Sequence, residues 1–265
     1  MSKLPYLVML WLTVGFVTDT ATPPDPNRFT KVVLDNDLNE PMELAIADDG
    51  IVYYIERVGY LSSFDPKTNK KRRIAKLDVR LAGEDGLLGL ALDPAFSTNH
   101  WLYLYYGDPI VQAGGYVNVL ARFELTTTGL SNRKALLNVP LLHEGVSHSG
   151  GSLTFDKQGN LFLSTGDNTN PFESGGYGPF DDRPGRQRFD ALKSAGSTND
   201  LRGKILRIHP EADGSYTIPA GNLFAVGTPQ TRSGATRPEI YVMGCRNPFR
   251  IAVDAHTGYL YWGEG

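Results

Sequence analysis

One pattern occurs four times along this chain of 265 residues and restricts the folds available to it. Each copy has a short apolar segment, an acidic or polar turn that usually contains glycine, and then a segment rich in aromatic and β-branched residues. The four copies span residues 44–56, 89–106, 152–167 and 250–264. Short strand-like runs joined by such turns are typical of β-hairpins. The sequence therefore predicts four hairpins built to the same plan.

Further strand-like runs follow these hairpins. They cover residues 60–64, 72–77, 117–125 and 203–208. A hairpin with one or two additional strands, repeated along a chain, is typical of one blade of a β-propeller. The spacing of the copies varies because insertions fall in loops, notably at residues 108–115 and 168–199. We therefore expect an all-β propeller with about four blades in this chain, and a β-sandwich is the alternative fold.

The N-terminal residues differ in character from the rest. Lys3 is followed by an apolar stretch at residues 4–17 and then by a polar segment that contains prolines. This is the pattern of a secretory signal peptide, and an uncleaved membrane anchor is the alternative. We therefore expect residues 1–22 to be a signal peptide, residues 28–265 to form the propeller domain, and the protein to be periplasmic or secreted. No later apolar run is long enough to span a bilayer.

Charge and cysteine content narrow the functional classes. The formal net charge of -3 gives no reason to expect a nucleic-acid partner. Cys245 is the only cysteine, so the chain cannot form an intrachain disulfide, which suits a periplasmic protein better than a disulfide-rich extracellular module. No base stands at a motif spacing from Cys245. We interpret it as a small buried residue and not as a nucleophile.

The repeats predict where polar residues converge. In a propeller the first strands of all blades line a central channel and run in the same direction. If Ala47, Asp93, Asp156 and Asp254 are equivalent, the positions about eight residues upstream collect at one channel mouth. These positions hold Asn39, Glu40, Glu84, Asp85, His148, Ser149, Arg246 and Asn247. A histidine beside an arginine and carboxylates can supply a base and an electrophile, whereas the alternative is that these groups only solvate the pore.

At these same positions the sequence resembles the glucose/sorbosone dehydrogenases. The similar segments are residues 83–96, 148–153, 166–167, 199–208, 244–248 and 262–264. The resemblance implies a six-bladed propeller that uses pyrroloquinoline quinone (PQQ) with a calcium ion (Ca2+). It also implies oxidation of the anomeric hydroxyl of an aldose to a lactone, with an external electron acceptor.

The resemblance also assigns roles to individual residues. His148 matches the general base that removes the proton of the sugar hydroxyl. Arg246 matches the arginine that hydrogen-bonds the quinone oxygen where negative charge grows. Asn247 matches an amide that contacts the cofactor, and Glu84 occupies the position of a glutamine near the cofactor and the sugar. The expected catalytic residues are thus His148 and Arg246, and the expected cofactor-binding residues are Glu84, His148, Arg246 and Asn247.

The sequence departs from the family pattern in three ways. Ser147 stands where an aspartate precedes the histidine in well-known glucose dehydrogenases, and a serine cannot strengthen the imidazole as a base. Glu84 adds a negative charge beside a cofactor with three carboxylates. The family's calcium ligands and later basic residues would follow Gly265, so we expect a C-terminally truncated sequence, an unclosed ring and no turnover by this fragment alone. The metal ligands therefore stay unknown. Residues 167–170 offer oxygen ligands, although a turn role is favoured.

Two other functions remain open. One is a calcium-dependent, lactonase-like propeller hydrolase in which His148 activates water. The other is a non-catalytic propeller that presents a binding face. The sequence names neither the sugar, nor the electron acceptor, nor the oligomeric state.

Overall fold

A computed structural model describes residues 23, 25–112, 115–141 and 147–265. The expected signal peptide, residues 1–22, lies outside the described residues. The chain divides into two compact units, residues 1–34 and 35–265. The described part of the first unit contains the 3-10 turn η1 (Pro26–Arg28), which Asp25 caps by accepting a hydrogen bond from Asn27 N. The strands belong to the second unit.

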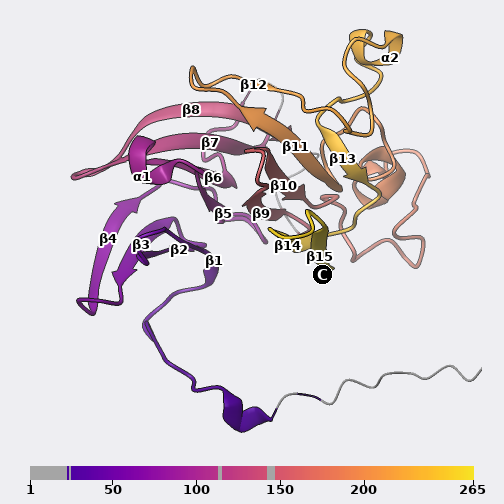
Figure 1. Cartoon of the computed structure of the whole chain (residues 1–265). Helices are drawn as coiled ribbons and strands as arrows, with labels where there is room; N and C mark the ends of the chain where they lie inside the picture. The colour runs from indigo at the N-terminus through magenta and orange to yellow at the C-terminus, as the bar shows by residue number, and fades with distance from the viewer. Residues whose placement is uncertain (1–22, 24, 113–114, 142–146) are drawn as a thin grey trace, which may run out of the picture. The chain divides into compact units, whose positions relative to one another are not determined.

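The second unit consists of antiparallel sheets that follow one another along the chain (Figure 1). The first sheet contains β1 (Pro41–Ile46), β2 (Val52–Glu56), β3 (Tyr60–Asp65) and β4 (Lys70–Lys76). The second contains β5 (Leu87–Leu92), β6 (Trp101–Gly107), β7 (Val117–Thr126) and β8 (Gly129–Pro140). The third contains β9 (Gly150–Phe155), β10 (Leu161–Thr165), β11 (Lys204–Pro210), β12 (Tyr216–Thr217) and β13 (Ile240–Met243). The fourth contains β14 (Pro248–Val253) and β15 (Leu260–Glu264).

This arrangement confirms the all-β architecture and its blades. The four predicted hairpins are β1–β2, β5–β6, β9–β10 and β14–β15. The additional strands predicted from the sequence are β3, β4, β7 and β11. A β-sandwich would combine the strands into two facing sheets, whereas here each hairpin opens a sheet of its own, and the sheets do not close into a ring.

Sequence reasoning missed β8, β12 and β13. The middle of β8, residues 132–135, is exposed because this strand is the outermost of its sheet. An outer strand buries few side chains, so its sequence carries little apolar alternation. The helices are short: α1 (Phe96–Asn99), α2 (Pro229–Arg232), η2 (Gln187–Phe189) and η3 (Ala191–Lys193). Within the described ranges, no helix is both long and apolar enough to cross a membrane.

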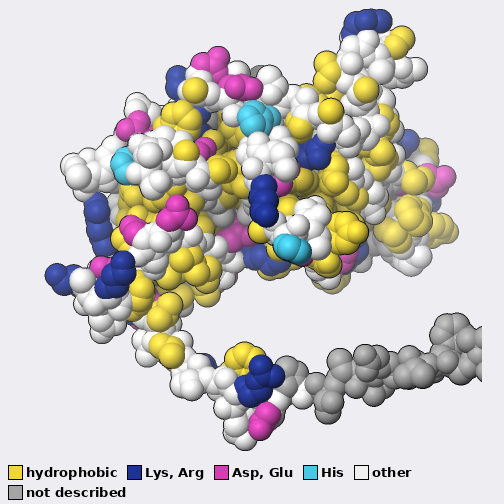
Figure 2. Space-filling view, viewed as in Figure 1, with side chains coloured by type: hydrophobic (Ala, Val, Ile, Leu, Met, Phe, Trp, Pro, Cys, Tyr) yellow, Lys and Arg dark blue, Asp and Glu magenta, His cyan; other side chains and the backbone are white. Residues whose placement is uncertain are grey.

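The outer strand of the first sheet, β4, is strongly basic. Its first four residues, 70–73, are lysines and arginines, and all four are exposed. Figure 2 shows lysine and arginine side chains on the surface over this strand. Lys71 forms an ion pair with Asp35, and Arg73 lies 3.6 Å from a carboxylate oxygen of Glu56. Charged side chains on an outer strand discourage pairing with a second chain.

Neighbouring sheets touch through their first strands. Gly89 in β5 faces Gly151, in β9, so closely that a Cβ on Gly89 would lie 2.0 Å from Gly151 O. The two backbones therefore meet directly. Glu43 in β1 joins the same region, because its Oε2 accepts hydrogen bonds from Leu90 N (2.8 Å) and Leu153 N (3.3 Å). Burial raises the pKa of Glu43 to about 7. One carboxyl group thus connects the first strands of three blades.

Candidate active site

His148 lies just before β9, in a backbone conformation that few residues adopt. Its φ is 61°, and Gly150 follows with φ of 61°. Such positive φ values are uncommon outside glycine and often mark functional sites. The turn places the imidazole in the interior, where it is 3% exposed. Gly166 makes this path possible, because a Cβ there would lie 1.9 Å from His148 O.

The imidazole of His148 is paired with a buried carboxylate. Its Nδ1 lies 2.7 Å from Oδ1 of Asp167, which is 1% exposed. Asp167 is itself fixed by Thr169, whose backbone N and Oγ1 each donate to Asp167 Oδ1 at 2.8 Å. A carboxylate can only accept, so the neutral imidazole carries its proton on Nδ1 and its lone pair on Nε2. No described residue forms a hydrogen bond with Nε2.

Asp167 is the functional residue whose role the sequence analysis missed. Ser147 cannot strengthen the imidazole as a base, and in the structure the carboxylate of Asp167 contacts the ring instead. The signal lies in the hairpin register. Thr165 of β10 pairs with Gly150 of β9. Asp167 lies two residues after Thr165 and His148 lies two residues before Gly150, so the two side chains come next to each other beyond the end of the hairpin. Asp167 also closes a turn with Thr169, as the turn interpretation of residues 167–170 predicts.

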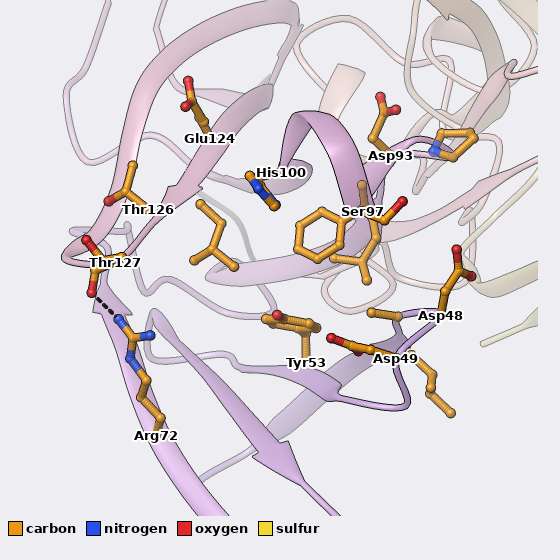
Figure 3. Close-up of a pocket in the computed structure, with 16 residues that line it drawn as sticks. Asp48, Asp49, Tyr53, Arg72, Asp93, Ser97, His100, Glu124, Thr126 and Thr127 are labelled. Atoms are coloured by element: carbon orange, nitrogen blue, oxygen red, sulfur yellow. Dashed lines mark hydrogen bonds between the residues drawn. The ribbon is translucent and has the colours of Figure 1, made fainter.

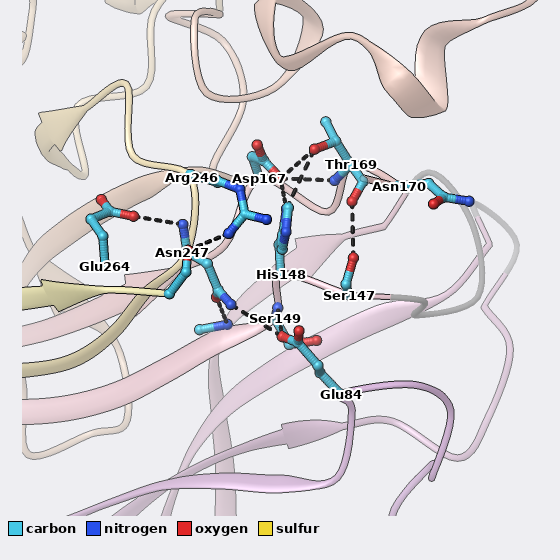
Figure 4. Close-up of polar contacts among 12 residues, drawn as sticks. Glu84, Ser147, His148, Ser149, Asp167, Thr169, Asn170, Arg246, Asn247 and Glu264 are labelled. Atoms are coloured by element: carbon cyan, nitrogen blue, oxygen red, sulfur yellow. Dashed lines mark hydrogen bonds and ion pairs between the residues drawn. The ribbon is translucent and has the colours of Figure 1, made fainter. Parts of the chain in front are cut away.

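Arg246 and Asn247 reach this site from the segment before β14. Arg246 O accepts a hydrogen bond from Asp167 N at 2.8 Å, which fixes the two backbones side by side. The guanidinium of Arg246 is exposed, and its Nη1 donates to Gly265 O. The amide of Asn247 is buried, and its Oδ1 accepts from Gly150 N at 3.0 Å. Figure 4 shows Arg246 and His148 on either side of Asp167.

Glu84 also lies in this group, and its charge is partly compensated. Oε2 of Glu84 accepts from Ser149 N at 3.1 Å and from Asn247 Nδ2 at 3.3 Å (Figure 4). Two donors from other blades therefore bind this carboxylate. They stabilise part of the negative charge that was expected to be unfavourable beside the cofactor. Next to it, the buried Asp85 pairs with Arg80 at 2.7 Å and accepts from Ser149 Oγ at 2.7 Å.

The first blade meets the site less directly. Glu40 forms an exposed ion pair of 2.9 Å with Arg57. Arg57 Nη1 in turn donates to Asp85 O at 2.8 Å. Asn39 N donates to Glu56 Oε1 at 2.8 Å. The predicted convergence thus unites Glu84, His148, Arg246 and Asn247 closely, and connects Asn39 and Glu40 to them only through neighbouring residues.

A buried lysine anchors the long insertion beside the site. Lys204 is fully buried, and its Nζ donates to the carbonyl oxygens of Ser194 (2.8 Å), Ala195 (3.0 Å) and Arg202 (2.7 Å). Burial lowers the pKa of Lys204 to about 8. Gly244 N donates to Ala195 O at 3.1 Å, so the anchored segment supports the strand of chain that carries Arg246. The end of the insertion is therefore part of the scaffold of the site.

Cys245 belongs to this scaffold as well. It is 4% exposed, and its backbone N donates to Gly203 O at 3.1 Å. Burial, followed by the nearby charge of Glu264, raises the pKa of the thiol to about 12. A thiol with such a pKa is a poor nucleophile at neutral pH. The interpretation of Cys245 as a small buried residue is confirmed.

The donors and acceptors of the site can be compared with those that a quinone needs. An exposed guanidinium can donate to a carbonyl oxygen that gains negative charge, and the imidazole beside it can accept a proton. Among the described residues, no group of three or more histidine, cysteine, aspartate or glutamate side chains could hold a metal ion. The residues that fit the quinone end of PQQ are His148 and Arg246.

Comparison with known proteins identifies the relatives of this arrangement. The sequence model of the family described as Glucose / Sorbosone dehydrogenase matches residues 38–265. The aldose sugar dehydrogenase of Escherichia coli is 28% identical over 238 residues, which cover 88% of this chain and 55% of that protein. The Hedgehog-interacting protein of Mus musculus is 24% identical over 240 residues, which cover 83% of this chain and 31% of that protein. The chain thus spans about a third to about half the length of these relatives.

Solved structures give the same picture. An oxidoreductase from Thermus thermophilus, titled a glucose dehydrogenase, is 30% identical with a TM-score of 0.66, and the match covers 86% of this chain and 59% of that one. The PQQ-bound aldose sugar dehydrogenase of Streptomyces coelicolor is 26% identical with a TM-score of 0.60, covering 87% of this chain and 58% of that one. These neighbours share the β-propeller fold.

Proposed function

Because this chain belongs to the glucose/sorbosone dehydrogenase family, we propose that it is a PQQ-dependent aldose dehydrogenase that converts the anomeric hydroxyl of a sugar to a lactone. The family supports a sugar oxidoreductase in general terms, and a PQQ-bound relative supports the cofactor. The observation that carries the proposal is the pairing of buried His148 with Asp167, whose backbone N bonds Arg246 O, with the side chain of Arg246 drawn beside the pair in Figure 4.

The proposed mechanism begins with the proton of the sugar hydroxyl. His148 Nε2 accepts this proton, because Nδ1 is committed to Asp167 at 2.7 Å. Asp167 stabilises the positive charge that the imidazole then gains, and it keeps the ring in one orientation. The bound quinone supplies a hydride acceptor for the anomeric carbon. Arg246 provides a positive charge for the quinone oxygen where negative charge grows.

Glu84 and Asn247 position this set. Asn247 donates to Glu84 and accepts from Gly150 N, so it joins the turn that carries His148 to the second blade. We propose that the remaining acceptor of Glu84, Oε1, faces a sugar hydroxyl. An acidic acceptor at this place favours a polyhydroxylated substrate over an anionic one.

The proposed function implies an ion, an export signal and an electron acceptor. Calcium is included as the ion that accompanies PQQ in the family, and its ligands are not assigned. Residues 1–22 act as a signal peptide that exports a propeller domain of residues 28–265 to the periplasm or the exterior. An external acceptor reoxidises the cofactor.

Reconstitution tests the function directly. A complete version of the protein is mixed with PQQ and Ca2+, and reduction of an electron-accepting dye is followed with a panel of aldoses. We expect dye reduction that needs PQQ and sugar together, and an absorbance change when PQQ binds. Addition of a chelator tests the calcium expectation separately. If neither dye reduction nor an absorbance change occurs, the chain is not a quinoprotein.

The His148→Ala variant tests the assigned base. Loss of a general base lowers a rate by about 10²–10⁴-fold. We expect a fall in turnover of this size while PQQ binding persists. His209→Ala is the matched control, since His209 lies in β11 and bonds Asn160 Oδ1 at 3.1 Å, outside the site. Near-full activity of His148→Ala would show that another group is the base.

A non-catalytic binding propeller is the second candidate. The similarity to Hedgehog-interacting protein over 83% of this chain favours it. A binding face, however, does not need a buried imidazole–carboxylate pair, which argues for catalysis. Calcium-dependent hydrolysis of a lactone without PQQ would instead indicate the hydrolase.

A further inference from the structure

The turn that carries His148 is held by three blades. Residues 148–150 lead into β9 one after another, and each of them bonds a different blade. His148 bonds its own blade, Gly150 bonds the segment before β14, and Ser149, between them, bonds the second blade. The position of the imidazole therefore depends on contacts that form only when the blades pack together.

Ser149 is bound twice by the segment that precedes β5. Its backbone N donates to Glu84 Oε2 at 3.1 Å, and its Oγ donates to Asp85 Oδ1 at 2.7 Å. Ser149 is 4% exposed, so water competes little for its hydroxyl. Figure 4 shows Ser149 between the imidazole of His148 and the carboxylate of Glu84. We call these two bonds the Ser149 clasp.

The acceptor of the Ser149 hydroxyl, Asp85, is held in one place. It is completely buried, and its Oδ2 accepts a hydrogen bond from Arg80 Nη2 at 2.7 Å. Its Oδ1 also accepts from Asn118 Nδ2 at 3.2 Å, and its backbone O accepts from Arg57 Nη1 at 2.8 Å. A side chain that is bound at both oxygens cannot turn away. The hydroxyl of Ser149 therefore meets an acceptor in a fixed position.

The ion pair of Arg80 and Asp85 is a poor source of stability. Both side chains are buried, and the cost of removing two charges from water offsets most of their attraction. Nε and Nη1 of Arg80 are buried without a hydrogen-bond partner in the described part of the chain, and the guanidinium lies over the ring of Tyr116 at 4.7 Å. An apolar pair would avoid this cost. What the carboxylate adds is a strong acceptor for Ser149, since hydrogen bonds to charged groups are stronger than those between neutral groups.

The Ser149 clasp acts on His148 through the backbone. His148, directly before Ser149, has a φ of 61°, a conformation that persists in such a residue only when the surrounding contacts fix it. Asp167 holds one atom of the ring, Nδ1, at 2.7 Å. The clasp holds the chain from which the ring projects. Together the two contacts fix the direction of Nε2, which one contact alone leaves free.

We propose that Ser149 is a positioning residue, which directs Nε2 of His148 toward the hydroxyl of the sugar. The inference rests on the proposed function, because it assigns the removal of the hydroxyl proton to Nε2. Ser149 acts through His148, and Asp85 with Arg80 holds Ser149. Without the hydroxyl of Ser149 the turn relaxes, and the ring leaves Asp167 more often. A base that is displaced by about 1 Å can lose about 10²-fold in rate.

Turnover of the Ser149→Ala variant tests this role in the complete protein, loaded with PQQ and Ca2+. We expect kcat to fall by about 10–10²-fold, because Nε2 is no longer aimed at the sugar. KM for the aldose and the affinity for PQQ should stay within about twofold of the unmodified values, because alanine leaves the binding groups in place. Ser149→Thr keeps a hydroxyl on Cβ and should recover kcat to within about threefold.

The Nδ1 proton of His148 gives a second measurement that needs neither cofactor nor sugar. Imidazole signals are recorded by NMR on the complete protein with isotope-labelled histidine, and the His148→Ala variant identifies the signal of His148. In the unmodified protein this proton lies in the bond to Asp167 and should exchange slowly with water. In Ser149→Ala we expect exchange to be at least about tenfold faster, because the ring leaves Asp167 more often.

Two other serines serve as controls for the loss of a hydroxyl. Ser62, in β3, is buried to a similar degree as Ser149, at 5% exposed. Ser97 lies in α1, in the wall of a pocket beyond the end of β5 that lies away from Glu84 (Figure 3). We expect Ser62→Ala and Ser97→Ala to keep both the turnover and the proton exchange of the unmodified protein. Circular dichroism and thermal melting verify that each variant folds.

Several results would overturn the inference. Unchanged turnover in Ser149→Ala would contradict it, whether or not proton exchange becomes faster. Slower turnover with unchanged exchange would show that Ser149 acts on the sugar or the quinone directly and not through His148. An equal loss in Ser149→Thr and Ser149→Ala would assign the effect to side-chain size and not to the hydroxyl. If the unmodified complete protein reduces no dye, the proposed function fails, and proton exchange alone then decides whether the clasp holds His148.

Discussion

Acidic side chains lie at both ends of the hairpins, and they form different kinds of hydrogen bond at the two ends. At the turn end, each aspartate accepts a hydrogen bond from a backbone N–H two residues later. The pairs are Asp49 with Ile51, Asp93 with Ala95, Asp156 with Gln158 and Asp254 with His256. At the site end, Asp167 bonds His148 across 19 residues, and Glu84 bonds Asn247 across 163.

This difference separates what a short segment determines from what the assembled blades determine. The backbone bond of a turn aspartate joins residues two positions apart, so this effect is local and repeats wherever its motif repeats. A site carboxylate finds its partners only after neighbouring blades have packed. Substitutions at the turn end should therefore cost stability alone, whereas those at the site end should cost function.

The largest expected effect is at the site end. Asp167→Asn replaces an acceptor by an amide that can also donate, so the imidazole of His148 is no longer held with its proton on Nδ1. We expect turnover to fall by about 10²-fold or more, while PQQ binding is retained. Dye-reduction kinetics measure turnover, and the absorbance of PQQ measures its binding. Normal turnover would mean that the pair is structural, and the contrast between the ends would fail.

An intermediate effect is expected at Glu43, which joins three blades between the two ends. Its folded pKa of about 7 exceeds the ordinary value of 4.5, so the fold favours the neutral acid. The stability that this contributes is complete below about pH 4.5 and is lost as the pH rises through 7.

Glu43→Gln keeps a neutral group with similar hydrogen-bonding ability. We expect the variant to match the unmodified chain at pH 4.5 and to exceed its unfolding free energy by about 1–2 kcal/mol at pH 8. Urea unfolding at both pH values measures this. An identical pH dependence in both proteins would show that folding does not shift the pKa of this carboxyl, and would contradict its burial as a neutral acid.

The smallest effect is expected at the turn end. Asp156 accepts from Gln158 N at 2.9 Å and from Asn160 N at 2.8 Å. Asp156→Ala should lower the unfolding free energy by about 1 kcal/mol and leave the rate per folded molecule unchanged. Thermal melting and dye reduction on the same sample provide the comparison. A selective loss of activity would show that the two ends are coupled.

The same contrast explains how much of the fold was predictable. Each hairpin turn carries its own signal, such as Asp156 with Gly159, so all four hairpins could be located from local sequence. Repetition then indicated the blades. The outer strand β8 was not predicted, because its exposed residues carry no apolar period.

The site was predictable only in part. Equivalent offsets in the repeat placed His148, Arg246 and Asn247 at one end of the strands. They could not show that Asp167 pairs with His148, since that needed the register of β9 and β10 and the glycine at position 166. Nor could they show that Glu84 is held by Ser149 N, which depends on how closely two blades approach.

The burial of Cys245 gives the protein a built-in reporter of motion. The thiol is the only one in the sequence, and it lies in a buried cluster with Phe162 of β10, Ile205 of β11 and Ile251 of β14. A thiol reagent can reach it only when these pieces of chain separate. The rate of labelling under native conditions therefore measures how often this side of the site opens, without any engineered probe.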